Sequence, residues 1–357
     1  MTNQASSPDP IPAAVLLEFC VDVLQAYGVS DAHARTAADA LVATDCWGVF
    51  THGTKLLPGY VKRVRAGGIR TDAEPAIARE GPAWAVIDSR STLGQVSSVA
   101  AMRAAIAKAR SAGVGYAGVF NGNHFGAAGY YAWLAAREGM IGMAMANDIP
   151  SVAAPGSRTA VTGSNPIAYA IPAGAHDPIL LDVATSTVSG GKVYAARTRG
   201  EPIPPGWLIG PDGLPTTDGS LYPQKAVLTP MAGHKGYGIA LLVESLAGVL
   251  SGAAVTWKIG SWIFDDPSLP TNHGAAFLAF DVKAIMPERE FLERVDALIA
   301  EIRATPAAPG ASRVLLPGER EWELRKRYLA EGIPLPAEVR EILRALAAEA
   351  GVKRRRI

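Results

Sequence analysis

The sequence predicts an α/β protein with at least two packed lobes. The first quarter of the chain shows only helical periodicity. From about Pro75 short strand-like runs alternate with helical runs, and from about Tyr237 the chain is mainly helical again. Such alternation is typical of an α/β lobe. The 357 residues also exceed what one compact core usually holds.

The first quarter is expected to contain three helices. Apolar side chains recur at helical spacing before Gly28, which ends the first helix. Ser30 or Asp31 can cap the second helix. A third helix is expected at 57–66, ended by two glycines. A chain that begins this way does not resemble a dinucleotide-binding Rossmann domain, which begins with a strand.

The middle of the chain is expected to form the α/β lobe, because short apolar runs alternate there with longer helical segments. The expected elements are a strand at 83–88, a helix at 97–112, a strand at 114–120, a helix at 125–137, and strands at 141–146, 166–171 and 179–182.

The remainder is expected to be loop and helix. Residues 200–224 are rich in Pro, Gly and Asp, which predicts a long surface loop. Residues 238–255 form the longest apolar run, but Glu244 interrupts it and it is too short for a membrane span, so a buried helix is expected. The other expected elements are helices at 238–250, 288–303 and 337–350 and a strand at 275–280.

Composition excludes several classes of protein. The chain is 49% hydrophobic and 19% charged, which excludes disordered and fibrous proteins. Its 34 basic and 33 acidic residues leave a net charge of +1, and a nucleic-acid-binding protein usually has a clear basic excess. The one basic run, at 353–356, is expected to be a solvated tail. Neither a nucleic acid nor a membrane is therefore expected as a partner.

The cysteines indicate the cellular compartment. Cys20 and Cys46 lie on separate expected helices, and two cysteines cannot build a disulfide framework. The first ten residues lack the pattern of a signal peptide. We therefore expect a cytoplasmic protein.

Residues 113–118 match the pattern GxGxxG. In a Rossmann unit these glycines follow a strand and open a helix. Here a helix precedes them and they lead into a strand, so the context is reversed. We expect Gly113 to end the helix and the other glycines to lie in the strand.

Three histidines stand among glycines or small polar residues, where a ligand can approach the backbone closely: His52, His124 and His234. The six histidines show no paired spacing of the kind that binds metal, so no metal site is expected. A loop histidine bonded to a carbonyl group is the alternative for each one. Three such segments in one chain favour a functional site.

Histidine and aspartate in these settings fit hydride transfer to or from a small acid. Oxidising a 2-hydroxy acid needs a base for the hydroxyl proton, and histidine has a pKa of roughly 6.5, near the working pH. Asp182 ends an expected strand and is followed by hydroxyl residues, so it can accept a hydrogen bond from a cofactor hydroxyl. Capping the following turn is the alternative role for Asp182.

Over nearly its whole length the chain resembles the type-2 malate/L-lactate dehydrogenase family. That family includes sulfolactate and ureidoglycolate dehydrogenases and piperideine-2-carboxylate reductases. The resemblance is carried by ordered motifs: ThrHisGly at 51–53, AsnGlyAsnHisPheGly at 121–126, GlySerAsnProIle at 163–167, LeuAspValAlaThrSer at 181–186 with GlyLys at 191–192, HisLysGlyTyrGly at 234–238 and LeuProGlyGluArg at 316–320.

The resemblance implies a fold and a division of the chain. It implies a non-Rossmann α/β lobe that binds the nicotinamide cofactor, NAD or NADP, packed on a helical lobe formed by both chain ends. Residues 1–74 would start the helical lobe, 75–229 would form the cofactor-binding domain, and 230–357 would complete the helical lobe. A homodimer with its active site near the interface is also implied.

The resemblance also implies roles for single residues. His124 stands at the family's catalytic acid/base position, and His52, preceded by Thr51, stands where the substrate is contacted. Asp148 aligns with a position beside the cofactor that usually carries a small hydroxylic or amide residue. The remaining cofactor-binding positions are Asp182, Val183, Ala184, Lys235, Gly318, Glu319 and Arg320.

Two positions depart from the family pattern. Thr51 replaces a frequent serine and keeps the hydroxyl. Leu56 stands where many members carry an arginine that can hold the substrate carboxylate. Lys55 is adjacent, but one residue along a helix points about 100° away. The sequence therefore leaves the carboxylate anchor open.

The function expected is hydride transfer between NAD or NADP and a small 2-hydroxy or 2-oxo acid. Reduction of a cyclic ketimine such as piperideine-2-carboxylate is the alternative. A non-catalytic dinucleotide-binding homologue is a third possibility, for which the absent arginine is the sole support. The sequence leaves the substrate and the choice between NAD and NADP open.

Overall fold

The structure is a computed structural model that describes residues 9–352 and Ile357. The basic run at 353–356 and the first eight residues lie outside this part, so the expectations placed on them stay predictions. Within it, no helix is both long and apolar enough to cross a membrane.

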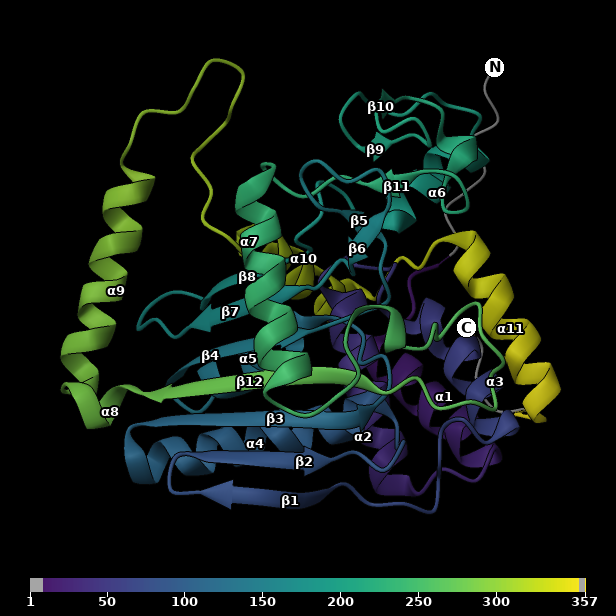
Figure 1. Cartoon of the computed structure of the whole chain (residues 1–357). Helices are drawn as coiled ribbons and strands as arrows, with labels where there is room; N and C mark the ends of the chain where they lie inside the picture. The colour runs from purple at the N-terminus through teal and green to yellow at the C-terminus, as the bar shows by residue number, and fades with distance from the viewer. Residues whose placement is uncertain (1–8, 353–356) are drawn as a thin grey trace.

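Helices and strands alternate through the middle of the chain (Figure 1). The α-helices are α1 (Ala13–Ala26), α2 (Asp31–Cys46), α3 (Leu57–Ala66), α4 (Gly94–Ala112), α5 (Ala128–Ala136), α6 (Gly190–Thr198), α7 (His234–Val243), α8 (Val282–Ile285), α9 (Glu288–Arg303), α10 (Glu319–Glu331) and α11 (Ala337–Ala350). The strands are β1 (Ala76–Gly81), β2 (Trp84–Asp88), β3 (Val114–Gly122), β4 (Met140–Ala146), β5 (Val152–Ala153), β6 (Ala160–Thr162), β7 (Ile167–Ile171), β8 (Ile179–Val183), β9 (Leu208–Ile209), β10 (Pro215–Thr216), β11 (Val227–Leu228) and β12 (His273–Asp281).

A seven-stranded sheet forms the centre of the molecule, in the order β1-β2-β3-β12-β4-β7-β8. Only β2 and β3 are parallel neighbours; the other pairs are antiparallel. Helices α4 and α5 cover one face, where Gly115 and Gly142 let the helix backbone approach the strands. Helix α7 lies on the other face (Figure 1).

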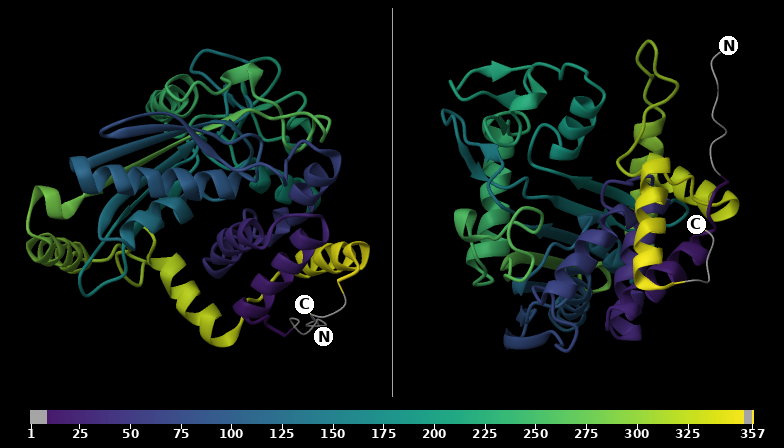
Figure 2. Two further views of the ribbon diagram at one scale, coloured as in Figure 1. Left: turned by 90° about the horizontal axis from the view of Figure 1, so that it is seen from below. Right: turned by 90° about the vertical axis from the view of Figure 1, so that its right-hand side faces the viewer.

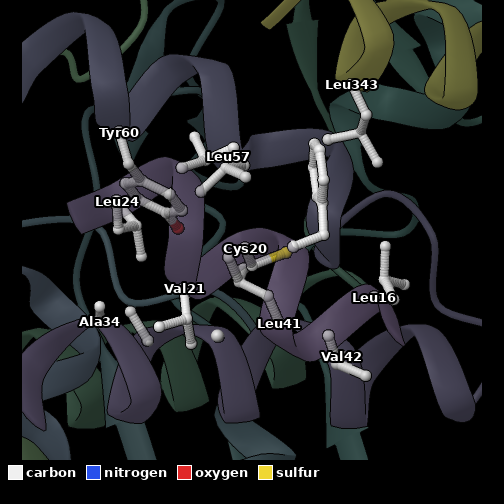
Figure 3. Packing of buried hydrophobic residues seen from close by; sticks show 14 of the residues in the cluster. Leu16, Cys20, Val21, Leu24, Ala34, Leu41, Val42, Leu57, Tyr60 and Leu343 are labelled. Atoms are coloured by element: carbon white, nitrogen blue, oxygen red, sulfur yellow. The ribbon is translucent and has the colours of Figure 1, made fainter. Parts of the chain in front are cut away.

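The helical lobe unites the two ends of the chain, as expected. Helix α11 packs against α1 and α3, α1 packs against α2, and Ile11 pairs with Ile333 through a backbone bridge. Leu343 of α11 reaches the same apolar core as Leu16 and Leu41 (Figure 3). Figure 2 shows α11 beside the N-terminal helices.

The chain after residue 230 contributes to both lobes. Helix α11 completes the helical lobe, but β12 lies in the middle of the seven-stranded sheet, between β3 and β4. The boundaries at 74 and 229 stay a prediction. The structure adds that residues beyond 230 enter the sheet.

Residues 200–224 are more ordered than the surface loop that we expected. They supply β9 and β10 to a second sheet, in the order β10-β9-β11-β5-β6. Leu208 and Tyr222 are buried in a small core with Val193 of α6. The apolar side chains of this segment are spaced irregularly, so no periodic signal revealed the small core.

The apolar run after residue 238 is not the buried helix that we expected. Helix α7 begins earlier, at His234, and continues as a π-helix, η3, over Glu244–Val249. Leu242 is 51% exposed and Val249 is 67% exposed. A helix that is apolar all round normally lies in a core. The exposed apolar face of α7 and η3 is therefore a candidate surface for contact with another protein chain.

Smaller differences concern the start of one helix and elements that were not expected. Helix α5 starts at Ala128 rather than near residue 125, because Gly126 takes a positive φ of 84°. Strand β1 and helix α10 were not expected; the high charge of α10 obscures its apolar face. Helices α3, α9 and α11 have the expected bounds, and Ser30 caps α2 by accepting from the His33 amide.

Gly113 ends α4 with a φ of 83°, and the glycines after it lie in β3. The expectation that the GxGxxG pattern is not a nucleotide fingerprint is therefore confirmed for its structural context.

Candidate active site

A cavity of about 690 Å³ opens at one edge of the central sheet. Strands β3, β4 and β8 run toward this edge, and β12 and β7 start from it. Residues at these strand ends therefore form a row, from β3 to β8: His124, His273, Asp148, Pro166 and Val183. The turn between α2 and α3 and the start of α10 also line the cavity.

A buried glutamate fixes the middle of this edge. Glu244 accepts hydrogen bonds from the side-chain amides of Asn147 (3.2 Å) and Asn165 (2.8 Å) and from the backbone amide of Thr256 (2.8 Å). Asn147 and Asn165 lie just after β4 and just before β7. The π-helix after α7 thereby holds the two strand ends that flank Asp148.

His124 follows β3 on a turn that Asn123 holds in place. The amide nitrogen of Asn123 donates to the Thr92 carbonyl (2.9 Å), and its oxygen accepts from the Thr271 hydroxyl (3.0 Å). The Tyr60 hydroxyl lies 2.8 Å from Nδ1 of His124. The Trp262 ring stacks on the imidazole, with 4.3 Å between centroids. These contacts leave Nε2 for the cavity that His124 lines.

Burial strongly affects His124. It lowers the pKa of the imidazole to about 3, because the charged form is disfavoured away from water. The negative charge of Asp148 acts in the opposite direction. His124 is therefore neutral at ordinary pH and able to accept a proton.

His52 lies opposite His124, with 6.3 Å between ring centroids. The Thr51 hydroxyl lies 2.9 Å from Nδ1 of His52, and burial lowers the pKa of this imidazole also. Asp45 holds the turn by accepting from the amide (3.0 Å) and the hydroxyl (2.6 Å) of Thr54. Burial raises the pKa of Asp45 to about 7.

Asp148 pairs with His273, a histidine without a local sequence signal. Nε2 of His273 donates to Oδ1 of Asp148 over 3.1 Å, and the Ile149 amide donates to the same oxygen over 2.8 Å. Burial acts to raise the pKa of Asp148, but the hydrogen bond and charge of His273 hold it below its usual value.

The segment expected to bind the cofactor lies at the β8 end of the cavity. Oδ2 of Asp182 accepts from the Gly129 amide at the start of α5 (2.7 Å). The side chain is exposed at the cavity, but the surrounding protein displaces water from the carboxyl group and raises the pKa of Asp182 to about 6. Val183, Ala184 and Arg320 line the same part of the cavity. The alternative role expected for Asp182 was to cap the turn after β8, but its hydrogen bond among the described residues goes to the start of α5 instead. The other carboxylate oxygen is not bonded to this helix.

Gly318 completes this end of the cavity. It has a φ of 89°, and a Cβ would lie 2.8 Å from the Leu180 backbone oxygen. Both observations require glycine here. The loop that carries Gly318 can therefore lie directly against β8.

Two of the expected cofactor residues do not line the cavity. Glu319 is bonded to Arg303 and to the Leu316 amide. Lys235 is exposed on the first turn of α7. The structure brings the remaining nine expected site residues together: Thr51, His52, His124, Asp148, Asp182, Val183, Ala184, Gly318 and Arg320.

Leu56 does not face the cavity; it packs against the core of the helical lobe. Lys192, in the first turn of α6, does line it. A Cβ at Gly191 would lie 3.8 Å from Cγ2 of Thr51, so this turn of α6 adjoins the Thr51–His52 turn. The GlyLys pair at 191–192 was the sequence signal for this cation.

Tyr60, Trp262 and His273 could not be assigned to the site from sequence. Tyr60 has the spacing of a core residue in α3, Trp262 lies in a loop, and His273 starts a strand. Only the fold brings them to His124 and Asp148.

The malate/L-lactate dehydrogenase family model matches residues 11–344. The chain is 38% identical to a malate dehydrogenase of Pyrococcus horikoshii over 350 residues, covering 96% of each chain. It is 31% identical to an NAD(+) ureidoglycolate dehydrogenase of Escherichia coli, covering 88% of this chain and 89% of that one.

A Pseudomonas putida Delta(1)-pyrroline-2-carboxylate/Delta(1)-piperideine-2-carboxylate reductase is 30% identical, over 94% of this chain and 96% of that one. Among solved structures, the malate dehydrogenase of Pyrococcus horikoshii OT3 superposes with a TM-score of 0.88 at 35% identity, covering 98% of this chain and 97% of that one. Similarity of this extent covers both lobes and the cavity between them.

Proposed function

This chain belongs to the malate/L-lactate dehydrogenase family, and we propose that its cavity carries out hydride transfer with His124 as the general acid/base. The protein is an oxidoreductase that uses NAD or NADP and acts on a small 2-hydroxy or 2-oxo acid. The role proposed for His124 is supported by the geometry of its imidazole ring. Nδ1 is engaged by Tyr60 while Nε2 is left for the cavity.

The cavity suits a nicotinamide dinucleotide. Its volume lies in the range of ligand sites, and it runs along the strand-end row from His124 to β8. At the β8 end, the oxygen of Asp182 that is not bonded to Gly129 can accept from a ribose hydroxyl. Arg320 offers a cation for phosphate oxygens. When bound, the cofactor supplies or accepts the hydride at the substrate carbon.

The protein's own part in the reaction is proton transfer and orientation. As a base, His124 carries its single proton on Nδ1, donates it to the Tyr60 oxygen, and keeps the Nε2 lone pair free. Nε2 then takes the proton of the substrate hydroxyl. Trp262, stacked on the imidazole, and Tyr60 hold the ring in one orientation.

We propose Lys192 and Thr51 as the contacts of the substrate carboxylate. Lys192 is a cation of the cavity lining, beside the turn that carries Thr51. Its ammonium can take the place of the arginine that Leu56 does not supply. The opposite position of His52 makes it a second donor to the substrate.

Reduction of a cyclic ketimine is the second candidate. Asp148 gives it specific support, because a carboxylate in the cavity favours a protonated imine over a neutral carbonyl group. The similarity to the Pseudomonas putida reductase agrees with this candidate.

One assay separates the candidates. The absorbance of the reduced nicotinamide is followed with both cofactors against malate, lactate, sulfolactate and cyclic imino acids. Turnover of the hydroxy acids supports the first candidate, and turnover of the imino acids alone supports the second. Absence of turnover with every pair would contradict both.

We also propose that the protein is a homodimer. Large apolar side chains are exposed along residues 241–269, which we call the apolar patch. Its members are Leu241, Leu242, Val249, Leu250, Trp257, Ile263, Phe264 and Leu269. Exposed apolar surface of this extent is typical of an interface between subunits. Trp262, which stacks on His124, lies within this segment, so the interface would adjoin the active site.

We place the protein in the cytoplasm. Both cysteines, Cys20 and Cys46, are buried and free. Unpaired thiols agree with a reducing compartment.

A further inference from the structure

Asp148 is the acidic side chain at the centre of the strand-end row. Its Oδ1 is held by the His273 side chain and the Ile149 amide. Its Oδ2 accepts no hydrogen bond from the part of the chain that the structure describes. The side chain is 28% exposed, while that of His273 is 5% exposed. One carboxylate oxygen is therefore fixed, and the other remains free at the cavity.

The carboxylate is ionised without a lysine or arginine beside it. Burial is the largest single effect and acts to raise the pKa of Asp148. The hydrogen bonds from His273 and the Ile149 amide and the electrostatic effect of the neighbouring histidines together outweigh it, so the pKa stays low. No Lys or Arg forms an ion pair with Asp148 within residues 9–352. The ion-pair partner of Asp148 among the described residues is His273, which is charged only when it is protonated. Without that proton the carboxylate has no countercharge, which is costly away from water. A cation bound in the cavity would supply that countercharge.

The position of Asp148 narrows the choice of cation. It lies between His124, where the proton is transferred, and the β8 segment, where the dinucleotide would be held. If the dinucleotide is held at β8, its nicotinamide ring has to lie near Asp148 in order to reach a substrate at His124. In the oxidised cofactor this ring carries a positive charge, and hydride transfer to the ring removes it.

We propose that the Asp148–His273 pair binds the oxidised nicotinamide ring by its charge and thereby favours the oxidised over the reduced cofactor. Asp148 supplies the negative charge, and His273 is a positioning residue that keeps the carboxylate oriented. This inference rests on the proposed function, since it requires the cofactor to lie along the row.

The consequence is that the site binds the oxidised cofactor in preference to the reduced one before substrate arrives. A side chain that attracts only the charged ring strengthens binding of the oxidised cofactor and leaves the reduced cofactor almost unaffected. Each tenfold difference between the two dissociation constants shifts the potential of the bound two-electron couple by about 30 mV.

The test compares cofactor binding by the wild type and Asp148→Asn, without substrate. Asparagine has the same shape and still accepts from His273 and Ile149, so the fold is kept. We expect the Kd of the oxidised cofactor to rise about tenfold or more, which corresponds to about 1.4 kcal/mol per factor of ten. The Kd of the reduced cofactor should stay within about threefold. Both are measured by titration calorimetry at neutral pH.

Asp72→Asn is the matched control. It removes one carboxylate that is 71% exposed and pairs with Arg70, so it should change neither dissociation constant. His273→Phe removes the positioning hydrogen bond. It should weaken binding of the oxidised cofactor in the same direction as Asp148→Asn, but by less.

Three outcomes overturn the inference. Equal changes in both dissociation constants would mean that Asp148 affects the shape of the site and not the charge felt by the ring. No change in either constant would mean that Asp148 does not face the ring. If the ratio of the two cofactor dissociation constants is unchanged but a cyclic imino acid binds more weakly, the charge of Asp148 acts on the substrate and not on the nicotinamide ring. If the wild type binds neither form of cofactor, the proposed function fails instead.

Discussion

Among single residues, His124 combines two properties: its imidazole is partly buried, and its Nε2 is left for the cavity. Burial keeps the imidazole neutral, which is the form that a general base needs. The negative charge of Asp148 favours a proton on His124, the proton that His124 would gain in the proposed oxidation of a hydroxy acid. Neutral His124 and ionised Asp148 therefore both suit the oxidative direction.

The lowered pKa of His124 predicts a pH dependence of stability. The pKa is about 3 in the folded protein and roughly 6.5 in an unfolded chain. As the pH falls from 6.5 toward 3, the unfolded state binds a proton that the folded state does not. The free energy of unfolding should therefore decrease across this window.

Urea denaturation of the wild type and His124→Gln measures this contribution. The variant cannot titrate at this position, so its stability should decline less steeply between pH 6.5 and the onset of acid unfolding. Identical slopes for the two proteins would contradict the assignment of the lowered pKa.

Lys192→Met tests the carboxylate anchor. The substitution removes a charge-assisted hydrogen bond, worth about 1.5–3 kcal/mol. KM for an acidic substrate should rise roughly tenfold to a hundredfold, with kcat changed much less. Lys225→Met, an exposed lysine outside the cavity lining, is the control. An unchanged KM in Lys192→Met would rule out this anchor.

The sequence predicted some of the residues that line the cavity and missed others. His52, His124 and Asp182 stood out because their neighbours and strand-end positions restrict what they can do. Tyr60, Trp262 and His273 carry no local signal, since each belongs to the site only through contacts with distant segments. Lys235 and Glu319 are the reverse case: both lie in sequence motifs, but neither lines the cavity.

At the scale of elements, the turn between α2 and α3 positions Thr51 and His52 against the sheet edge. Gly53 leaves no space for a side chain: a Cβ there would lie 1.8 Å from Oδ1 of Asp45. Asp45 is in turn bonded to Thr54. The turn therefore depends on both residues.

Gly53→Ala should displace Asp45 and shift His52. We expect a loss of about 1–3 kcal/mol in the free energy of unfolding, the usual cost of overpacking, together with lower kcat/KM. Gly238→Ala is the control, because a Cβ at this position of α7 meets nothing within 4 Å. A Gly53→Ala protein with normal stability and activity would show that the turn tolerates a side chain.

Elements with regular periodicity were predicted well, and irregular ones were not. Helices α3, α9 and α11 are amphipathic, with one apolar and one polar face, so the helical spacing of their apolar residues predicts where they begin and end. The short strands within 200–224 have too few residues to show a period. The exposed face of α7 was missed because an apolar run does not reveal whether a core or another subunit covers it.

At the scale of the whole molecule, the site exists because distant segments meet at one sheet edge. Strand β12 comes from the last third of the chain but pairs with β3 and β4, which places His273 between His124 and Asp148. Local pattern cannot predict such long-range pairing. The resemblance to the family supplied the architecture that periodicity alone left open.

The apolar patch predicts the oligomeric state. Val249→Glu places a charge at the proposed interface and should convert a dimer to a monomer in light scattering after size-exclusion chromatography. Leu298→Glu, on an exposed apolar position of α9, should leave the dimer intact. A wild type that is monomeric at all concentrations would contradict the proposed homodimer.

Proton transfer by His124 is the step on which the proposed reaction depends. The decisive measurement is steady-state turnover of His124→Ala, with cofactor affinity measured on the same preparation. Loss of the general acid/base should reduce kcat by roughly a hundredfold or more, while Kd for the cofactor stays near the wild-type value. A variant that turns over at nearly the wild-type rate would contradict the role proposed for His124.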